Sequence, residues 1–236
     1  MKKKLFFVLG LLMAVAMQGQ TYWNGTSNKT FSGSGTQADP YLIGTAEQLA
    51  GLAERTNVDK EDFAGMYIKL TADIYLTNFN DTDTASWPQW EPIGHHHWEG
   101  MDNGFRDTCF FRGHFDGDGH TVYNMFYGGG LDWGSDINLN PYDWENNNME
   151  ELENLEYTSW YRGLFGFVKD GSIENVSVEN ATLCGIYISP LVTYVGANAV
   201  VRNCHAKNNT MLSTTGTNYA FINANLGLIE NCSVEG

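Results

Sequence analysis

The chain is poor in basic residues and has no hydrophobic run long enough to cross a membrane. Its 236 residues include 13 Lys and Arg against 28 Asp and Glu, a formal net charge of −15. A field of that sign repels nucleic acid and anionic lipid headgroups. The longest apolar run, 5–17, is 13 residues long, whereas a membrane-spanning helix needs about 20. We therefore expect neither a nucleic-acid partner nor a membrane span.

The apolar run instead has the features of a cleaved leader. Lys2, Lys3 and Lys4 precede it, and small or polar residues follow it up to Gln20. This order of a basic, an apolar and a small-residue segment is typical of a secretory signal peptide. We predict a Sec signal peptide at 1–20, and a mature protein that is secreted, extracellular or held at the cell surface.

Cysteines and catalytic motifs are scarce. Four Cys are spread along the chain without a C-x-x-C pair, too few for a disulfide scaffold in a domain of this length. The sequence has no nucleophile elbow, Walker loop, dinucleotide fingerprint or H-E-x-x-H motif. The run His95–His97 is more typical of a solvated loop than of a metal site, because adjacent side chains of an extended segment point apart. We expect no metal and no cofactor, and enzymatic activity has little support.

A repeat of 28 residues occupies the last third of the chain. Its copies are Ile173–Val178, Val201–Ala206 and Ile229–Val234, each reading apolar, polar, Asn, apolar, polar, apolar. A fixed period of this length indicates a solenoid, in which each short strand covers the next at about 4.8 Å. Asn at the third position suits a bend, because Asn tolerates left-handed backbone angles. The pattern predicts an all-β fold, a parallel β-helix of about five coils, with these Asn in a column.

Earlier segments extend the same pattern. Val122–Tyr127 fits the template 51 residues before Ile173, which is one unit and 23 extra residues, so we place an insertion at 128–162. Residues 66–76 predict strands of a first coil. Residues 45–56 predict a short amphipathic helix, with a capping box between its Thr and Gln, that closes the end of the solenoid. The predicted single domain, 21–236, divides into an N-terminal strand and cap helix (21–62), first coils (63–127), the insertion (128–162) and the repeats (163–236).

The segment 115–121, FDGDGHT, combines two carboxylates with an imidazole. A calcium loop beginning at Asp116 would need Glu at its twelfth position, where the chain has Tyr127. Gly117 and Gly119 beside the Asp residues are typical of a tight turn instead. We predict a corner between two strands.

Cys204 and Cys232 stand at the same position in successive units, where Val176 stands in the first. Stacked strands would bring their Cα atoms within disulfide range, although parallel side chains often fail the required torsion. We favour two small apolar side chains stacked in the interior. Whether the pair is bridged is left open by the sequence.

Several segments resemble a known family. "GLFG" at 163–166, followed by "SIENVSVENA", and the upstream "GSGTQADPYLIGTAEQLAGLA", "WEPIG" and "FRGHFDGDGHTVYNM" are similar to segments of GLUG-motif exported surface proteins of the Bacteroides type. Later units replace the glycines, at 190–193 and 220–223. The resemblance implies a right-handed parallel β-helix at the cell surface, with adhesive, binding or substrate-presenting roles.

The aromatic residues suggest a binding surface. All seven Trp precede Gly163, and the insertion holds Trp133, Tyr142, Trp144 and Trp160 among Asp and Asn residues. Flat apolar rings with short polar side chains suit a glycan ligand; alternatively the insertion folds back and buries its Trp residues. We predict an adhesion or binding module for glycans. The alternatives are a polysaccharide lyase or glycoside hydrolase that uses carboxylates of the insertion, and a structural stalk. The strand edge of the last unit predicts a partner, or a continuation of the chain, at the C-terminal coil.

Overall fold

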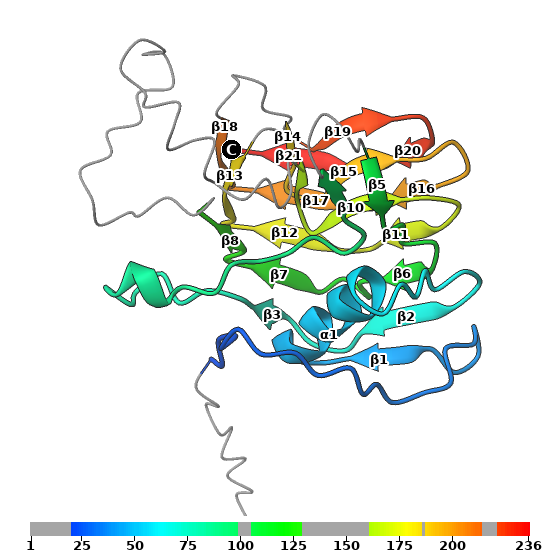
Figure 1. The fold of residues 1–236 in the computed structure, drawn as a ribbon, viewed down its shortest axis with the longest axis horizontal. Helices are drawn as coiled ribbons and strands as arrows, with labels where there is room; N and C mark the ends of the chain where they lie inside the picture. The colour runs from blue at the N-terminus through cyan, green and yellow to red at the C-terminus, as the bar shows by residue number, and fades with distance from the viewer. Residues whose placement is uncertain (1–19, 99–104, 129–160, 186, 214–220) are drawn as a thin grey trace, which may run out of the picture.

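A computed structural model describes residues 20–98, 105–128, 161–185, 187–213 and 221–236. In these ranges the chain is built of short strands, most of them in parallel sheets, with one α-helix and one short 3-10 helix, η1 (Thr84–Ser86) (Figure 1). The all-β prediction is confirmed. None of the helices in these ranges has the length and apolar character needed to cross a bilayer.

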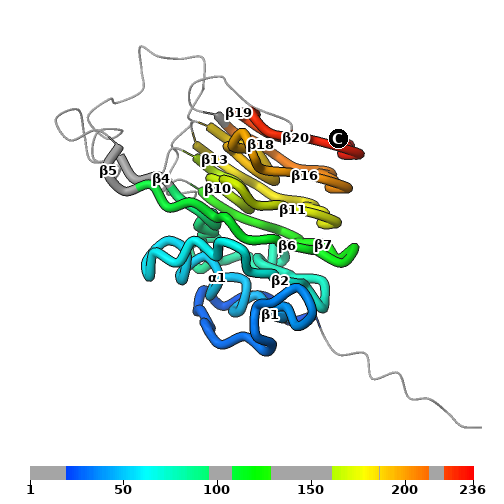
Figure 2. The backbone as a smooth tube through the Cα atoms, turned by 90° about the vertical axis from the view of Figure 1, so that its right-hand side faces the viewer, coloured from blue at the N-terminus to red at the C-terminus, as the bar shows by residue number. Residues whose placement is uncertain are grey.

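The largest sheet has six parallel strands, and their order in space follows their order along the chain. In that order they are β1 (Tyr41–Ile43), β2 (Tyr67–Leu70), β6 (His114–Asp116), β11 (Ser172–Glu174), β16 (Val200–Arg202) and β20 (Leu228–Glu230). In the four inner strands the residues Ile68, Phe115, Ile173 and Val201 are buried, and the residues on either side of each face outward. Each strand therefore belongs to one layer of a stack, which Figure 2 shows from the side, with β1 near the bottom and β20 near the top.

The remaining strands continue the same layers on the other sides of the core. A five-stranded sheet contains, in spatial order, β3 (Ile74–Tyr75), β7 (Thr121–Tyr123), β12 (Ser177–Glu179), β17 (His205–Lys207) and β21 (Ser233–Glu235). Two three-stranded sheets contain β8 (Phe126–Tyr127), β13 (Thr182–Gly185) and β18 (Thr210–Ser213), and β10 (Phe165–Val168), β15 (Val192–Val195) and β19 (Ile222–Asn225). Two pairs are parallel β9 (Tyr161–Arg162) with β14 (Tyr187–Ile188), and antiparallel β4 (His96–Trp98) with β5 (Phe105–Thr108).

The predicted helix is present as α1 (Ala46–Asn57), beside the first layers of the stack (Figure 1). Thr45 Oγ1 accepts a hydrogen bond from the N–H of Gln48 at 3.2 Å, as an N-cap should. The Gln48 side chain, however, accepts from the N–H of Gly44 rather than from that of Thr45. Leu49 and Leu52 are fully buried, so the helix joins its apolar face to the core of the sheets.

The bends between strands have left-handed backbone angles. Asn175, Asn203 and Asn231 have φ of 55°, 52° and 52°. The corner predicted at 115–121 is confirmed, since β6 ends at Asp116, β7 begins at Thr121, and Asp118 and Gly119 lie between them at φ 51° and 82°. Asn and Gly occupy such positions at the least steric cost.

The proposed alignment of Val122–Tyr127 with the first repeat is wrong. Val122 pairs with Val178, and Phe115 with Ile173, so Asn124 corresponds to a second bend at Asn180. The unit that begins at Ile173 has two bends that both read apolar, polar, Asn, apolar, at Asn175 and Asn180, and the template matched the wrong one. Phe115 and Ile173 are 58 residues apart, so about 30 extra residues separate these two units instead of the 23 expected.

The six-stranded sheet also has one more layer than the five coils expected. Residues 66–76 do form strands, β2 and β3, but they are not the first layer, because β1 pairs with β2 ahead of them. The three residues Tyr41–Ile43 are too short for periodicity to identify as a strand.

The glycines of the GLFG segment are explained by packing between layers. Phe165 pairs with Val192, and Val192 with Ile222, so the predicted correspondence of these segments is right. A Cβ atom on Gly166 would lie 2.1 Å from the carbonyl oxygen of Gly94, and one on Gly163 would lie 2.4 Å from that of Ser189. A side chain at either position would therefore push two layers apart.

Cys204 and Cys232 are stacked thiols without a disulfide bond, as we favoured. Cys204 is fully buried and Cys232 partly so. A hydrogen bond between the two thiols raises the pKa of Cys204, and burial raises it further.

Candidate functional site

An open groove of about 670 Å³ lies on the outward face of the six-stranded sheet. It crosses strands β1, β2, β6 and β11, and the residues before β1 form one wall. The residues that line it are Gln37, Pro40, Leu42, Tyr67, Ile68, Lys69, Thr71, His114, Phe115, Asp116, Ser172 and Glu174. Because outward residues of neighbouring strands are in register, the polar side chains of this groove form two rows.

The first row contains an aromatic stack. Tyr67 on β2 and His114 on β6 are paired in the sheet, and their ring centroids lie 4.6 Å apart at an interplanar angle of 25°. His114 Nδ1 lies 3.0 Å from Ser172 Oγ on the next strand. The row therefore offers flat apolar surface beside a hydroxyl and an imidazole nitrogen.

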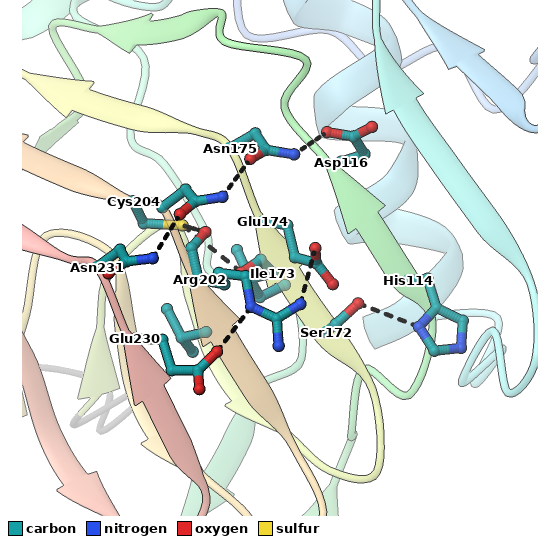
Figure 3. A network of polar contacts seen from close by, with 12 residues as sticks. His114, Asp116, Ser172, Ile173, Glu174, Asn175, Arg202, Cys204, Glu230 and Asn231 are labelled. Carbon is teal, nitrogen blue, oxygen red and sulfur yellow. Dashed lines mark hydrogen bonds and ion pairs between the residues drawn. The ribbon is translucent and has the colours of Figure 1, made fainter.

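The second row, two residues further along each strand, is charged. In register across five strands it reads Lys69, Asp116, Glu174, Arg202, Glu230. Arg202 Nε lies 2.8 Å from Glu230 Oε2, and Arg202 Nη1 lies 3.7 Å from Glu174 Oε2 (Figure 3). The hydrogen bond to Glu230 raises the pKa of Arg202.

Polar contacts also fix the two residues of this row that lie deepest in the N-terminal layers, Lys69 and Asp116. Lys69 Nζ lies 3.0 Å from Asp118 Oδ1, and this bond raises the pKa of Lys69. Asp116 Oδ1 accepts from Asn175 Nδ2 at 2.9 Å (Figure 3). It also accepts from the N–H of Asp118 at 2.9 Å. The carboxylates thus stand in fixed positions, where a free oxygen can accept a hydrogen bond from a ligand hydroxyl. Within the described ranges, no group of three or more His, Cys, Asp or Glu is arranged to hold a metal ion.

The insertion begins and ends at a second polar cluster. β8 pairs directly with β13, so the chain between Tyr127 and Tyr161 connects adjacent layers. The guanidinium carbon of Arg162 lies 3.2 Å from the ring centroid of Tyr127, and Arg162 Nη1 lies 3.1 Å from Glu91 Oε2. Gly128 N–H donates to the side chain of Gln89 at 2.7 Å.

Arg162 is the most deeply buried charged residue of this cluster, with 2% of its surface exposed. Burial lowers the pKa of Arg162, and the negative charge of Glu91 opposes this effect. Burial likewise raises the pKa of Glu91, against the charge of Arg162. A cation held this way ties the last residue of the insertion, Arg162, to Tyr127, the residue directly before it.

The four predicted ligand-binding residues, Trp133, Tyr142, Trp144 and Trp160, lie outside the described residues. Two of the earlier Trp residues pack against other aromatic rings. Trp90 is buried against Trp23, and Trp87 packs against Phe79 and Phe126.

Sequence reasoning missed the groove residues Tyr67, His114 and Ser172. Each begins a strand and faces outward, but the two intervals between them, 47 and 58 residues, differ from the 28-residue period. An alignment of the short outward–inward–outward triplets YIK, HFD and SIE would have brought them together.

No family model matches the chain, and no solved structure matches it. A protein of Evansella cellulosilytica, named "Putative Gly-rich membrane protein", is 31% identical to it over 190 residues. The match covers 80% of this chain but 14% of the Evansella protein, so the chain spans a small part of that relative.

Proposed function

We propose that this protein is a secreted or cell-surface module that binds glycans on the side of a right-handed parallel β-helix. The observation that carries the proposal is the stacked pair Tyr67 and His114, placed beside Ser172 and a row of charged side chains in one groove. Sugars combine apolar C–H faces with hydroxyls, and such a surface meets both.

The β-helix is supported by the sheet topology. Neighbouring strands of the six-stranded and five-stranded sheets are parallel, and residues 28 positions apart pair from β11 to β16 and from β16 to β20. The chain returns to the same sheet once per unit and always in the same direction, which supports a chain that winds around the core. We assign a right-handed helix because connections between parallel strands of the same sheet are almost always right-handed.

The charge of the chain narrows the ligand class. Without the proposed leader, 10 basic residues face 28 acidic ones, a net charge of −18. Such a surface repels uronic or sulfated polysaccharides. We therefore expect neutral glycans, with Asp116 and Glu174 as acceptors for their hydroxyls.

The proposal also covers the cellular location of the protein and the role of the insertion. The leader at 1–20 directs the chain to export, and the name of the Evansella relative places that protein at a membrane. Trp133, Tyr142, Trp144 and Trp160 of the insertion are proposed as further contacts for the same glycan.

A glycan array tests the proposal with two variants and a matched control. We expect Tyr67→Ala to weaken binding of the best neutral glycan about tenfold or more, the loss of one stacking contact. Tyr123→Ala removes a comparable ring, stacked on Tyr75 at 4.7 Å on a different sheet, and should leave binding unchanged.

The double variant Trp133→Ala/Trp144→Ala tests the insertion separately from the groove. Loss of binding in this variant alone would move the site to the insertion. Absence of binding by the unmodified protein across neutral glycans would refute the proposal and favour the structural stalk.

A polysaccharide-cleaving enzyme is a second candidate because Asp116 and Glu174 are direct neighbours on adjacent strands. Neighbouring strands are about 4.8 Å apart, close to the carboxylate separation of retaining glycosidases. Both residues have structural partners, however, in Asn175 and Arg202. Release of reducing ends that is abolished by Glu174→Gln would establish the enzyme, and no release across a broad panel would exclude it.

A further inference from the structure

A second open pocket, of about 550 Å³, lies against α1 and shares no lining residue with the groove. Its walls come from three parts of the chain: the second half of α1, the segment before β1 and the segment before β4. Hydrogen bonds fix these walls in place. Trp23 N–H donates to the carbonyl of Tyr75 at 3.0 Å. At the end of α1, Asn57 Nδ2 donates to the carbonyl of Pro92 at 2.8 Å, and Asn57 Oδ1 accepts from the N–H of Gly94 at 3.1 Å.

Aromatic and aliphatic side chains supply the apolar part of this pocket. Trp23 and Trp90 meet edge to face, with ring centroids 5.7 Å apart. Trp90 is buried, whereas Trp23 is partly exposed. Ala53 is buried on the helix side, and Val58, 67% exposed, lies at the helix end. The pocket therefore offers apolar surface and an indole ring to a ligand of modest size.

The charged groups of the pocket are negative. Among the described residues that line it are two carboxylates, Glu54 and Glu91, and no Lys or Arg. Glu54 Oε1 lies 3.0 Å from Lys29 Nζ, but Lys29 Nζ also lies 3.0 Å from Asp59 Oδ2. One cation is thus shared by two carboxylates, and negative charge is left in excess on this side of the pocket.

Glu91 stands in a desolvated part of the wall. Its side chain is 47% exposed, and its Oε2 lies 3.1 Å from Arg162 Nη1. Burial nevertheless raises the pKa of Glu91, against the charge of Arg162. A carboxyl group that is open to solvent on one side and desolvated on the others lies in a concave surface. A cation that enters such a surface is screened less by water than one on an open face.

We propose that this pocket binds a small organic ammonium ion. The apolar groups of the ion pack against Trp23, Ala53 and Val58, and its charge lies near Glu54 and Glu91. A cation is attracted to the face of an indole ring, and methyl groups on its nitrogen bury apolar surface at the same time. The net charge of −15 also concentrates cations around the chain.

The donor set argues against a bare metal ion as the occupant. In the described part of the chain, no three His, Cys, Asp or Glu residues are grouped so that they could hold a metal. An apolar wall offers such an ion nothing, whereas it suits the carbon groups of an organic cation. The proposal is independent of the glycan ligand, because the two sites have no residue in common.

A pair of probes with the same shape tests the charge requirement on the full chain. Choline carries a quaternary nitrogen, and 3,3-dimethyl-1-butanol has a carbon atom in its place. Titrations are followed by the indole N–H signals of Trp23 and Trp90 in ¹⁵N NMR spectra. We expect choline to shift both signals and to bind about tenfold or more tightly than the alcohol.

Three carboxylate variants locate the site. Glu54→Gln and Glu91→Gln should each weaken choline binding about threefold or more. The matched control is Glu47→Gln, which removes a charge from the first turn of α1, outside the pocket, and should leave binding unchanged. Glu91→Gln also takes the counter-ion from the buried Arg162. The Glu54 variant and the neutral alcohol therefore test the proposal without disturbing that pair.

Three results would overturn the proposal. Equal affinity for choline and the alcohol would show an apolar pocket with no preference for a cation. Unchanged indole signals throughout the choline titration would show that the pocket binds no ammonium ion. A loss in Glu47→Gln as large as that in Glu54→Gln would assign the effect to the overall charge of the chain.

Discussion

Asn203 Nδ2 donates to Asn175 Oδ1 at 2.9 Å across 28 residues of sequence. Both residues have φ above +50°, so each amide closes a bend and also joins its layer to the next. Asn231 repeats the bond to Asn203 at 3.3 Å, and Asp116 begins the ladder by accepting from Asn175. One residue type thus meets a backbone requirement within each unit and a packing requirement between units.

Replacement of Asn203 separates these two requirements. Asn203→Ala should lower the free energy of unfolding by about 2–3 kcal/mol, since it loses two side-chain hydrogen bonds and places Ala in the left-handed region. Asn203→Gly removes the same bonds but fits the backbone, so about 1 kcal/mol less should be lost. Urea denaturation measures both. Equal losses would mean that the backbone angle contributes nothing.

Gly166 is predicted to tolerate no side chain. In Gly166→Ala the new Cβ would lie 2.1 Å from a backbone oxygen, so two layers must separate and we expect a loss of about 2 kcal/mol or more. The matched control is Gly65→Asn, where φ is 72° and no atom lies within 4 Å of the added Cβ. Thermal unfolding should show a clear drop for the first variant and little change for the second. The reverse order would contradict the packing of these layers.

Arg162 is predicted to stabilise the fold far more than an exposed arginine. Arg162→Ala removes a buried cation from the ring of Tyr127 and from Glu91, which is itself 47% exposed, and we expect about 2–3 kcal/mol of stability to be lost. Arg112 is the control, because its ion pairs with Asp62 and Asp170 are part-exposed and typically contribute about 0–1 kcal/mol. Chemical denaturation of both Ala variants tests the ranking. Similar losses would show that the base of the insertion is not held by Arg162.

The thiol of Cys184 makes the stability of the folded state depend on pH, and the sign of this dependence is defined. Burial raises the pKa of its thiol above the ordinary value of 9.0, although the charge of Arg162 opposes the shift. The folded state therefore holds the proton longer than the unfolded state. The stability that depends on the neutral thiol is complete below pH 9 and is lost as the pH rises above that value.

Comparison with Cys184→Ala isolates this effect. Between about pH 7.5 and pH 10 the unmodified protein should lose more free energy of unfolding than the variant does. Tyr and Lys groups titrate in both proteins, so their contributions cancel in the difference. Parallel stability curves over this range would contradict the assignment.

The period of the fold could be predicted from the sequence, whereas the register upstream could not. Ile173, Val201 and Ile229 repeat at equal spacing, and their pairing in the sheet follows directly. The two bends of the unit that begins at Ile173 have the same local pattern, and a long insertion separates Phe115 from Ile173. The local template could not distinguish the two bends. The upstream segment was therefore aligned with the first bend, although it forms the second.

The groove could not be predicted from the sequence, for a related reason. Tyr67, His114 and Ser172 are brought together only by strand pairing across two irregular intervals, and each alone is an ordinary strand residue. The Trp-rich insertion was conspicuous in composition, but composition does not place its residues in space. The helix, by contrast, is specified by local signals, the N-cap Thr45 and the apolar spacing of Leu49 and Leu52.

Methyl NOE spectroscopy tests the stacking of the units most directly. The account predicts strong contacts between the methyl groups of Ile173 and Val201, equally strong contacts between those of Val201 and Ile229, and weak or no contact between Ile173 and Ile229. Absence of the first two contacts would contradict the layered fold, and with it the groove.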